Sequence, residues 1–338
     1  MRAPGFWWRP GSAASLLLAP VGAAVGRIAA RRMARPSGLP PPIPVLCVGN
    51  FVAGGAGKTP TAIALARIVT AAGMKPAFLT RGYGGRLKGP VIVDPSEHGV
   101  VDVGDEALLL ARAAPTVVAR KRPWAFPLLQ DTGADIVIMD DGFQNPSVVK
   151  MLSLVVVDAA VGIGAGRVIP AGPLRAPLAE QLPRADAVLV IGEGEGGRDM
   201  VRRAARAGKP VLHARIVSNG LTSLAGTRVY AFAGIGRPQK FFDSLVDEGL
   251  DVVGTREFAD HHTFTGLDAR EILTAAAALD ATILTTEKDA VRLAGSSGGP
   301  QAELTEKTIV VPIACVFEDE ARVRQMIVEA RKAWIARR

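Results

Sequence analysis

The sequence has few of the residues that most often build disulfide frameworks, zinc sites or base-stacking surfaces. Its 338 residues contain two cysteines, Cys47 and Cys315, and four histidines. The cysteines have no disulfide or zinc-ligand spacing, which argues against a disulfide scaffold, and so few histidines argue against a histidine-rich zinc site. Aromatic residues make up 5% of the chain, so stacking of nucleic-acid bases on aromatic rings is disfavoured. We expect both thiols to be reduced and buried.

A long apolar run is missing at the N-terminus. The apolar stretch from Ser12 to Gly26 contains Pro20 and is about 15 residues long, short of the roughly 18–20 that cross a bilayer as a helix. Aromatic and basic residues flank it, namely Trp7, Trp8 and Arg9 before and Arg27, Arg31, Arg32 and Arg35 after. This pattern fits a helix in the headgroup region of an anionic membrane. A signal peptide and a helix packed on the protein's own surface are alternatives; we favour membrane attachment of residues 1–35.

Length and hydrophobic content indicate how many domains the chain forms, whereas its net charge does not identify the kind of molecule that it binds. The chain is 49% hydrophobic, which suffices for substantial cores, and its length suggests two domains. The net charge of +8 suits nucleic acid, anionic lipid or phosphorylated substrates alike. We place a first domain in residues 36–217 and a smaller α/β domain with a C-terminal helix in residues 218–338. Proline-rich Ser37–Pro44 is the expected linker into the first core strand.

A strand, a glycine-rich loop and a helix follow one another early in the chain. Val45–Asn50 is typical of a buried parallel strand, and Thr61–Ala72 carries apolar residues at helical spacing. The loop between them contains a candidate nucleotide site, made of Gly54, Gly55, Ala56, Gly57, Lys58, Thr59 and Pro60. Glycines let backbone N–H groups surround phosphates, and the helix adds its positive N-terminal end. Lys58 is predicted to reach the β- and γ-phosphates and Thr59 to bind Mg²⁺, although Val52 stands where the common pattern has glycine.

Further apolar runs alternate with helical segments. They are Ala77–Thr80, Val91–Val93, Thr116–Val118, Ile136–Met139, Leu154–Val157 and Ala187–Ile191. Such runs predict an α/β fold like that of the P-loop NTPases, with a mostly parallel sheet covered by helices on both faces. A second set predicts the smaller α/β domain, namely Arg228–Ala233, Val252–Val253, Thr282–Thr285 and Ile309–Val311. Ligands of parallel sheets bind at the carboxyl ends of the strands.

Charged residues follow several of these runs. Asp140 and Asp141 end the fourth run, and because two adjacent carboxylates repel each other they predict a bound cation, here a second contact to Mg²⁺. Arg81 follows an earlier run as the one fixed cation of a glycine-rich turn. Arg175 lies in a loop that prolines and glycines make rigid, where it is placed to bind phosphate.

Two further sites permit more than one interpretation. Asp105 precedes a predicted helix, and composition alone favours a role as its N-cap. Asp260 and His261 fit a proton-transfer pair, because a neighbouring carboxylate orients an imidazole and makes it more basic. A helix-cap partner beside a solvated histidine fits the same residues. The segment Thr286–Asp289 suggests a guanine-binding motif, but its spacing is wrong, so the preferred base stays open.

In this order, the motifs resemble the tetraacyldisaccharide 4'-kinase family, the lipid A 4'-kinases of Gram-negative bacteria. The resemblance covers nearly the full length and rests on Val48–Asn50 through Thr59–Pro60, Arg81–Gly85, Gly104–Glu106, Asp140–Gln144, Pro170–Arg175, Asp260–His262 and Thr286–Ala290. It implies a kinase that uses ATP and Mg²⁺. The phosphate would pass to the 4'-hydroxyl of a tetraacylated glucosamine disaccharide 1-phosphate, a late step of lipid A biosynthesis.

The resemblance also implies roles for individual residues. Asp105 would be the catalytic base, which replaces its interpretation as an N-cap, and His261 its partner, with Asp260 beside it. Lys58 would complete the catalytic set. Three residues would bind substrate, namely Arg81, Gln144 and Arg175. Two positions depart from the family pattern, since Asn145 stands in place of a histidine and Ala176 in place of an acidic residue, which leaves their roles open.

The family's fold consists of two α/β/α units joined by a two-stranded linker, and a cleft between the units would bring His261 to Asp105. Its partner would be an acylated disaccharide lipid at the cytosolic face of the inner membrane, where the protein would be peripheral or monotopic. We expect a monomer and no bound nucleic acid.

Two rival functions are testable. A nucleotide-switch ATPase of the partitioning or metal-delivery type also carries a Gly-Gly-x-Gly-Lys-Thr loop, but it has no reason for a membrane-seeking start or for Asp260 and His261. It would turn over ATP without phosphorylating a sugar. A basic nucleic-acid binder would show a steep salt dependence of its affinity.

Overall fold

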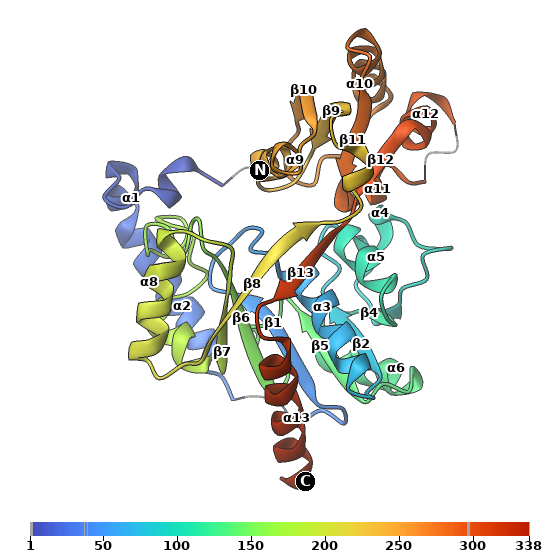
Figure 1. The fold of residues 1–338 in the computed structure, drawn as a ribbon. Helices are drawn as coiled ribbons and strands as arrows, with labels where there is room; N and C mark the ends of the chain where they lie inside the picture. The colour runs from blue at the N-terminus through green and yellow to red at the C-terminus, as the bar shows by residue number, and fades with distance from the viewer. Residues whose placement is uncertain (1–2, 37, 39, 296–297, 338) are drawn as a thin grey trace.

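The structure is a computed structural model that describes residues 3–36, 38, 40–295 and 298–337. In these residues the chain forms two α/β units, the smaller one uppermost in Figure 1. The large unit contains a nine-stranded sheet and the small unit a four-stranded sheet among the described residues. Residues 37 and 39 of the predicted linker lie outside the described part of the chain.

The large sheet has the strand order β13-β8-β7-β6-β1-β5-β2-β4-β3. Its strands are β1 Val45–Asn50, β2 Pro76–Thr80, β3 Val91–Ile92, β4 Thr116–Val118, β5 Ile136–Asp140, β6 Leu152–Asp158, β7 Ala187–Ile191, β8 Val211–Ser218 and β13 Ile313–Phe317. The strands from β8 to β4 pair in parallel, and the two edge strands, β13 and β3, are antiparallel. The predicted mostly parallel sheet is therefore confirmed.

Helices cover both faces of this sheet because its central strands are apolar on both sides. In β1, Val45 and Cys47 join the core on one face, and Leu46 and Val48 join the core on the other. The helices of the large unit are α1 Ala13–Leu17, α2 Ala19–Met33, α3 Lys58–Ala71, α4 Val100–Val103, α5 Asp105–Ala111, α6 Phe126–Asp131, α7 Leu178–Gln181, α8 Glu195–Arg206 and α13 Glu320–Ala336. Helices α3 and α13 pack on one face, and α2, α6 and α8 on the other.

The small unit repeats this layered design on a smaller scale. Its strands are β9 Arg228–Ala233, β10 Asp251–Glu257, β11 Thr282–Thr286 and β12 Thr308–Val311, all parallel in the order β10-β9-β11-β12. Its helices are α9 Pro238–Asp247, α10 Gly266–Ala278, α11 Glu287–Leu293 and α12 Gly299–Lys307. Phe241, Phe242 and Leu245 of α9 fill one core, and Ile272 of α10 lies in the core on the other face.

Two strands connect the units. β8 and β13 pair antiparallel with Ile313 opposite Ser218; β8 leads from the large sheet to the small unit, and β13 returns from the small unit into the large sheet (Figure 1). α13 then packs on the large sheet through Val323 and Ile327. The predicted range 218–338 for the small domain is thus too long at its end, because β13 finds its hydrogen-bonding partner in β8 and α13 returns to the large unit.

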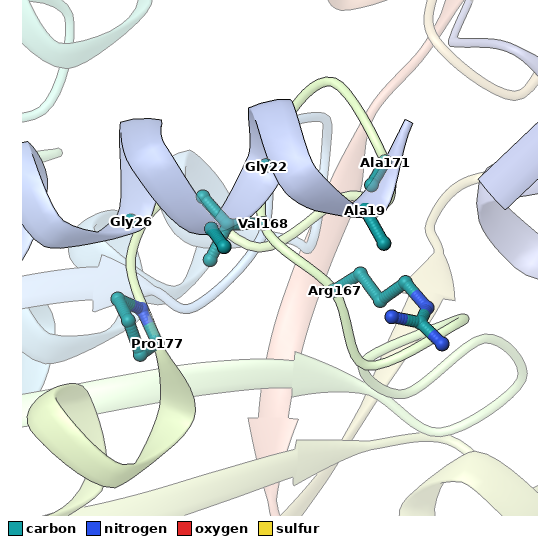
Figure 2. Close-up of a pocket in the computed structure, with 8 residues that line it drawn as sticks. Ala19, Gly22, Gly26, Arg167, Val168, Ala171 and Pro177 are labelled. Carbon is teal, nitrogen blue, oxygen red and sulfur yellow. The ribbon is translucent and has the colours of Figure 1, made fainter. Parts of the chain in front are cut away.

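The N-terminal segment lies on the large unit. Figure 2 shows Gly22 and Gly26 on the side of α2 that faces Val168 and Pro177. A side chain at Gly22 would place its Cβ 2.6 Å from the carbonyl oxygen of Val168, so only glycine permits this approach. A cavity of about 180 Å³ lies beside this contact, with Arg167 among its lining residues. One part of the segment therefore packs on the protein itself, as one of the alternatives predicted.

Other parts of the segment's surface present apolar side chains to solvent. Leu17 is 81% exposed and Ile28 67%, and Leu16, Val21 and Val25 are exposed as well. Among the described residues, no helix combines the length and the apolar character needed to cross a membrane.

Candidate active site

The phosphate loop lies at the carboxyl end of β1, the strand between β5 and β6. Gly57 precedes α3 with φ +88°, and Gly54 has φ +114°, conformations that favour glycine. A Cβ at Gly54 or Gly55 would meet no atom within 4 Å, so the space beside these two residues is open. The Asn50 side-chain amide donates to the Gly54 carbonyl at 3.1 Å. The loop therefore has the open backbone surface that phosphate binding requires.

Lys58 and Thr59 are the first two residues of α3, where the backbone N–H groups have no partner within the helix. Lys58 is 9% exposed and Thr59 4%. The Lys58 Nζ lies 3.8 Å from Asp141 Oδ1, and the Thr59 hydroxyl donates to Asp140 Oδ2 at 3.3 Å. The structure thus brings together the lysine, the hydroxyl and both aspartates predicted from the sequence.

Asp140 is a wholly buried carboxylate in need of a cation. It ends β5, and its Oδ1 has no hydrogen-bond partner among the described residues. Burial, followed by the nearby Glu106 charge, raises the pKa of Asp140 to about 7. Because a divalent cation between Thr59 and Asp140 would satisfy this oxygen, the two residues fit a magnesium ion that takes its other ligands from phosphates and water.

Asp141 is placed differently from Asp140. Its backbone has φ 56°, and its Oδ1 accepts a hydrogen bond from Arg175 Nη1 at 2.7 Å. Burial is the largest influence and raises the pKa of Asp141, but the Lys58 and Arg175 charges outweigh it and leave the pKa below its usual value. The charge of the Asp141 carboxylate, which was predicted to bind the metal, is therefore already balanced by two cations, Lys58 and Arg175. Among the described residues, no cluster of three or more His, Cys, Asp or Glu side chains is arranged for a metal.

Asp105 lies in the large unit beside residues of the small unit. It is the first residue of α5, whose N-cap is Gly104, so the interpretation of Asp105 as a cap is wrong. The side chain is 2% exposed, and Oδ2 lies 3.3 Å from His261 Nδ1. Arg292 of α11 also contacts Oδ2. The contact predicted between His261 and Asp105 across the two units is therefore present.

His261 follows β10 in a left-handed conformation with φ 60°. Its Nε2 lies 3.8 Å from Asp260 Oδ1, and its ring centroid is 5.2 Å from that of Tyr83. The hydrogen bond to Asp105 raises the pKa of His261, and the charges of Asp105 and Asp260 add to this effect. His262 instead pairs with Asp268 at 3.1 Å.

The charges around Asp105 favour its ionised form. Burial raises the pKa of this carboxyl, but the hydrogen bond with His261 and the charges of Arg292 and Lys288 hold it well below its usual range. Beside it, Glu106 accepts a hydrogen bond from Lys288 Nζ at 2.7 Å. Asp105 is thus a buried, ionised carboxylate at neutral pH.

A second set of charges joins the two units near the phosphate loop. Asp158, at the carboxyl end of β6, contacts Arg237, and Lys240 Nζ lies 3.6 Å from the same oxygen. A Cβ at Gly236 would lie 4.0 Å from the backbone nitrogen of Gly55. The turn before α9 therefore lies next to the phosphate loop.

The three predicted substrate-binding residues differ in their surroundings. Arg81 is exposed. Gln144 donates to the Asn50 carbonyl at 2.6 Å and to Gln181 Oε1 at 2.9 Å, and Arg175 donates to the Val52 carbonyl at 3.0 Å. Gln144 and Arg175 thus make internal contacts that hold the start of the phosphate loop, and their binding of substrate stays a prediction.

Several charged residues at the junction of the units were not predicted, namely Glu106, Asp158, Arg237, Lys288 and Arg292. Lys288 and Arg292 had one usable signal, because they are four residues apart directly after a predicted strand and so share a helix face. Asp158 also follows a strand. None of these signals shows which partner each residue meets.

Comparisons with known proteins agree with this geometry. The family model described as tetraacyldisaccharide-1-P 4'-kinase matches residues 14–332. A tetraacyldisaccharide 4'-kinase of Methylorubrum extorquens is 52% identical over 331 residues, covering 98% of this chain and 99% of the relative. A protein of the same name from Bradyrhizobium sp. (strain ORS 278) is 48% identical, covering 100% of this chain and 99% of the relative.

Among solved structures, a similar fold occurs in LpxK from Aquifex aeolicus, crystallised in complex with ATP. The TM-score is 0.72 at 24% sequence identity, and the match covers 94% of this chain and 99% of that chain. At this identity the match supports the fold alone, namely two α/β units connected by paired strands.

Proposed function

The chain belongs to the tetraacyldisaccharide-1-P 4'-kinase family, and from this we propose how its residues carry out the reaction. The protein is a phosphotransferase of lipid A biosynthesis that phosphorylates a tetraacylated disaccharide at its 4'-hydroxyl. The alternative of a nucleotide-switch ATPase is not favoured. ATP as the donor fits the phosphate loop.

One observation carries the proposal, namely that a phosphate loop and a carboxylate–imidazole pair meet where the two units touch. Lys58 marks the donor side, and its charge also acts on Glu106, the neighbour of the predicted base Asp105. His261 reaches Asp105 from the small unit. A sugar hydroxyl bound between the units would therefore face both a proton acceptor and the terminal phosphate.

On the donor side, binding and charge neutralisation are the main tasks. Backbone N–H groups of Gly54–Thr59 would surround the phosphates, and Lys58 would neutralise the β- and γ-phosphates. Thr59 and Asp140 would hold Mg²⁺, which when bound neutralises charge on the β- and γ-phosphate oxygens. Asp141 fixes Lys58 and Arg175 next to this site.

On the acceptor side, Asp105 would take the proton of the 4'-hydroxyl as that oxygen attacks the γ-phosphorus. The new O–P bond forms, the bond from the γ-phosphorus to the β–γ bridging oxygen breaks, and ADP leaves. The hydrogen bond from His261 orients Asp105 and offers a route for the proton to solvent, because the His261 side chain is 34% exposed.

We place the enzyme at the cytosolic face of the inner membrane, as a peripheral or monotopic protein. The exposed apolar side chains of α1 and α2, from Leu16 to Ile28, would enter the membrane interface. The positive charges of three α2 residues, Arg27, Arg31 and Arg32, would attract anionic lipid headgroups. Attachment to a membrane suits an acylated substrate, since exposing each acyl CH₂ group to water costs about 0.8 kcal/mol.

A transfer assay tests the proposal. The protein would be incubated with γ-labelled ATP, Mg²⁺ and a tetraacylated disaccharide 1-phosphate in mixed micelles. We expect label in the lipid, and none when the acceptor lacks its 4'-hydroxyl. Labelled inorganic phosphate without labelled lipid, at a rate that does not depend on the lipid, would indicate the switch ATPase instead.

A further inference from the structure

Arg292 joins the two units at the predicted catalytic pair. It lies on α11, whose N-cap Thr286 accepts a hydrogen bond from the Asp289 backbone. Its side chain is 3% exposed. Lys288 and Arg292 are one helical turn apart and face Glu106 and Asp105, the second and first residues of α5. Two consecutive acids of the large unit therefore meet two cations of the small unit in register.

The guanidinium of Arg292 uses all three of its nitrogens. Nε donates to Asp105 Oδ2 at 2.8 Å, and Nη2 contacts the same oxygen. Nη1 donates to the Gly234 carbonyl at 2.6 Å and to Asp289 Oδ1 at 2.9 Å. Asp289 is itself held by the Gly234 backbone N–H at 3.1 Å and by the Thr286 hydroxyl at 2.7 Å. The position of Arg292 is thus fixed from several sides.

Arg292 also contacts the imidazole of the pair. Its Nη2 lies 3.3 Å from His261 Nδ1, the same atom that lies 3.3 Å from Asp105 Oδ2. A guanidinium only donates hydrogen bonds and keeps its charge. The contact from Nη2 therefore favours a lone pair on Nδ1, whereas Asp105 favours a proton there. Arg292 and Asp105 thus act in opposite directions on the protonation of His261.

We propose that Arg292 is a positioning residue for phosphoryl transfer, which aims the Asp105 carboxylate and sets the proton affinity of the Asp105–His261 pair. This inference rests on the proposed function. It gives α11 a role in the reaction beyond packing, although Val291 of the same helix does pack on Ala107 and Leu108 of α5.

The charge balance predicts the direction of the effect. Asp105 faces Arg292, Lys288 and Asp289 from α11, His261 from the loop after β10 and Glu106 from its own helix, while His261 also faces Asp260 and the ring of Tyr83. Replacing Arg292 by a neutral side chain removes a cation beside both Asp105 and His261. The pKa values of both groups should then rise.

Comparing Arg292→Met with Arg292→Lys separates the effect of Arg292 on the orientation of the Asp105 carboxylate from the effect of its charge. We expect Arg292→Met to lower kcat about 100-fold and to move the acid limb of the kcat profile up by roughly 1–3 pH units, as loss of a nearby opposite charge does. Arg292→Lys keeps the charge but loses the planar two-pronged grip. Its acid limb should stay near that of the unchanged protein, while kcat falls about 10-fold.

Arg237→Met is the matched control, because it also removes one cation that joins the units, at Asp158. It should leave the acid limb in place. If Arg292→Met lowers kcat without moving the acid limb, or if Arg292→Lys matches the unchanged protein in both respects, Arg292 only fastens the units and the proposal is wrong. The Lys variant decides the question if the Met variant does not fold.

A second measurement does not depend on activity. Proton NMR of the metal-free protein would follow the titration of His261, assigned with His261→Gln, and its pKa should be higher in Arg292→Met. If the pKa of His261 is the same in Arg292→Met as in the unchanged protein, Arg292 does not set the proton affinity of the Asp105–His261 pair. If the unchanged protein transfers no phosphate to lipid, the proposed function fails, and this titration still reports on the contact of Arg292 with His261.

Discussion

Asp140 is the residue at which burial and charge conflict most strongly. In the folded, metal-free protein its pKa is raised to about 7, from 3.8. Since the folded state binds the proton more tightly than the unfolded state, the associated stability is present below pH 3.8 and is lost as the pH rises through about 7. A cation that neutralises Asp140 should restore it.

We therefore expect Asp140→Asn to stabilise the metal-free protein at pH 8 by about 4 kcal/mol relative to its effect at pH 4, because about three pKa units separate the folded and unfolded states. Thermal unfolding in EDTA at both pH values measures this. Mg²⁺ with ATP should raise the melting temperature of the unchanged protein and have little effect on the variant. An equal response of both proteins to Mg²⁺ would remove Asp140 from the metal site.

Asp105 is the residue whose loss should affect chemistry and spare nucleotide binding. Asp105→Asn keeps the shape of the side chain and removes the base, so transfer to lipid should fall about 100- to 10,000-fold. ATP affinity, measured by calorimetry, should stay within about threefold. Asp102→Asn is the control. Asp102 lies three residues before Asp105 in the chain, but it pairs with the exposed Arg86. Near-normal transfer by Asp105→Asn would exclude Asp105 as the base.

For individual residues, the sequence predicts contacts between partners that are close to each other along the chain. Glycines, Lys58 and Thr59 form one local loop, so their composition already specifies its chemistry. Arg292 meets Asp105 across 187 positions, and no spacing or periodicity encodes that contact. The His261 contact was expected only because the motifs resemble a known family.

Several strands whose residues are almost all buried have the boundaries that the sequence predicts. β1, β4, β7 and β9 begin and end at the predicted residues, because apolar runs bounded by turn residues mark buried strands. β8 was missed, since its residues alternate between buried and exposed positions. β13 was missed for a similar reason, as exposed Ile313 begins this edge strand and exposed Val316 lies between buried Cys315 and Phe317. The Gly299–Lys307 helix, α12, was also not predicted.

The N-terminal helices are the elements with a testable outer surface. Leu17 and Ile28 are exposed on α1 and α2, and burial of each in a membrane interface would contribute about 1.5–3 kcal/mol. Leu17→Glu with Ile28→Glu should therefore weaken sedimentation with anionic vesicles roughly 100-fold. Leu267→Glu is the control, as Leu267 is 64% exposed on the small unit.

ATP binding by both proteins would verify that they are folded. Equal sedimentation of the double variant and the Leu267→Glu control would show that this apolar surface does not attach the protein to membranes. Loss of sedimentation in high salt without any effect of the double variant would assign the attachment to the arginines of α2 instead.

The whole molecule consists of two layered units whose polar edges meet at the site. Sequence predicted both units but not where the chain returns to the first, because the pairing of β13 with β8 is a contact between distant segments. Two groups of charges span the junction, one at Asp105 and one at Asp158. Their positions indicate that docking of the small unit completes the site, since His261 and the turn at Gly236 both come from that unit.

Removing Asp158 should loosen this docking. The side chain is 7% exposed and faces two cations, Arg237 and Lys240, so Asp158→Asn leaves both without their carboxylate, and loss of one partner of a buried ion pair is costly. We expect KM for ATP to rise roughly 10-fold, equivalent to about 1.4 kcal/mol. Asp199→Asn is the control, because Asp199 pairs with Arg202 and Arg203 within α8.

Distances between spin labels distinguish loosening from a local effect on the phosphate loop. Labels at Arg206→Cys on α8 and Val246→Cys on α9 would report the separation of the units, since the native Cys47 and Cys315 are buried and should not react. Asp158→Asn should broaden the distance distribution, and an ATP analogue with Mg²⁺ should narrow it again. A raised KM with an unchanged distribution would mean that Asp158 acts on the phosphate loop directly and that the junction is held by the contacts at Asp105.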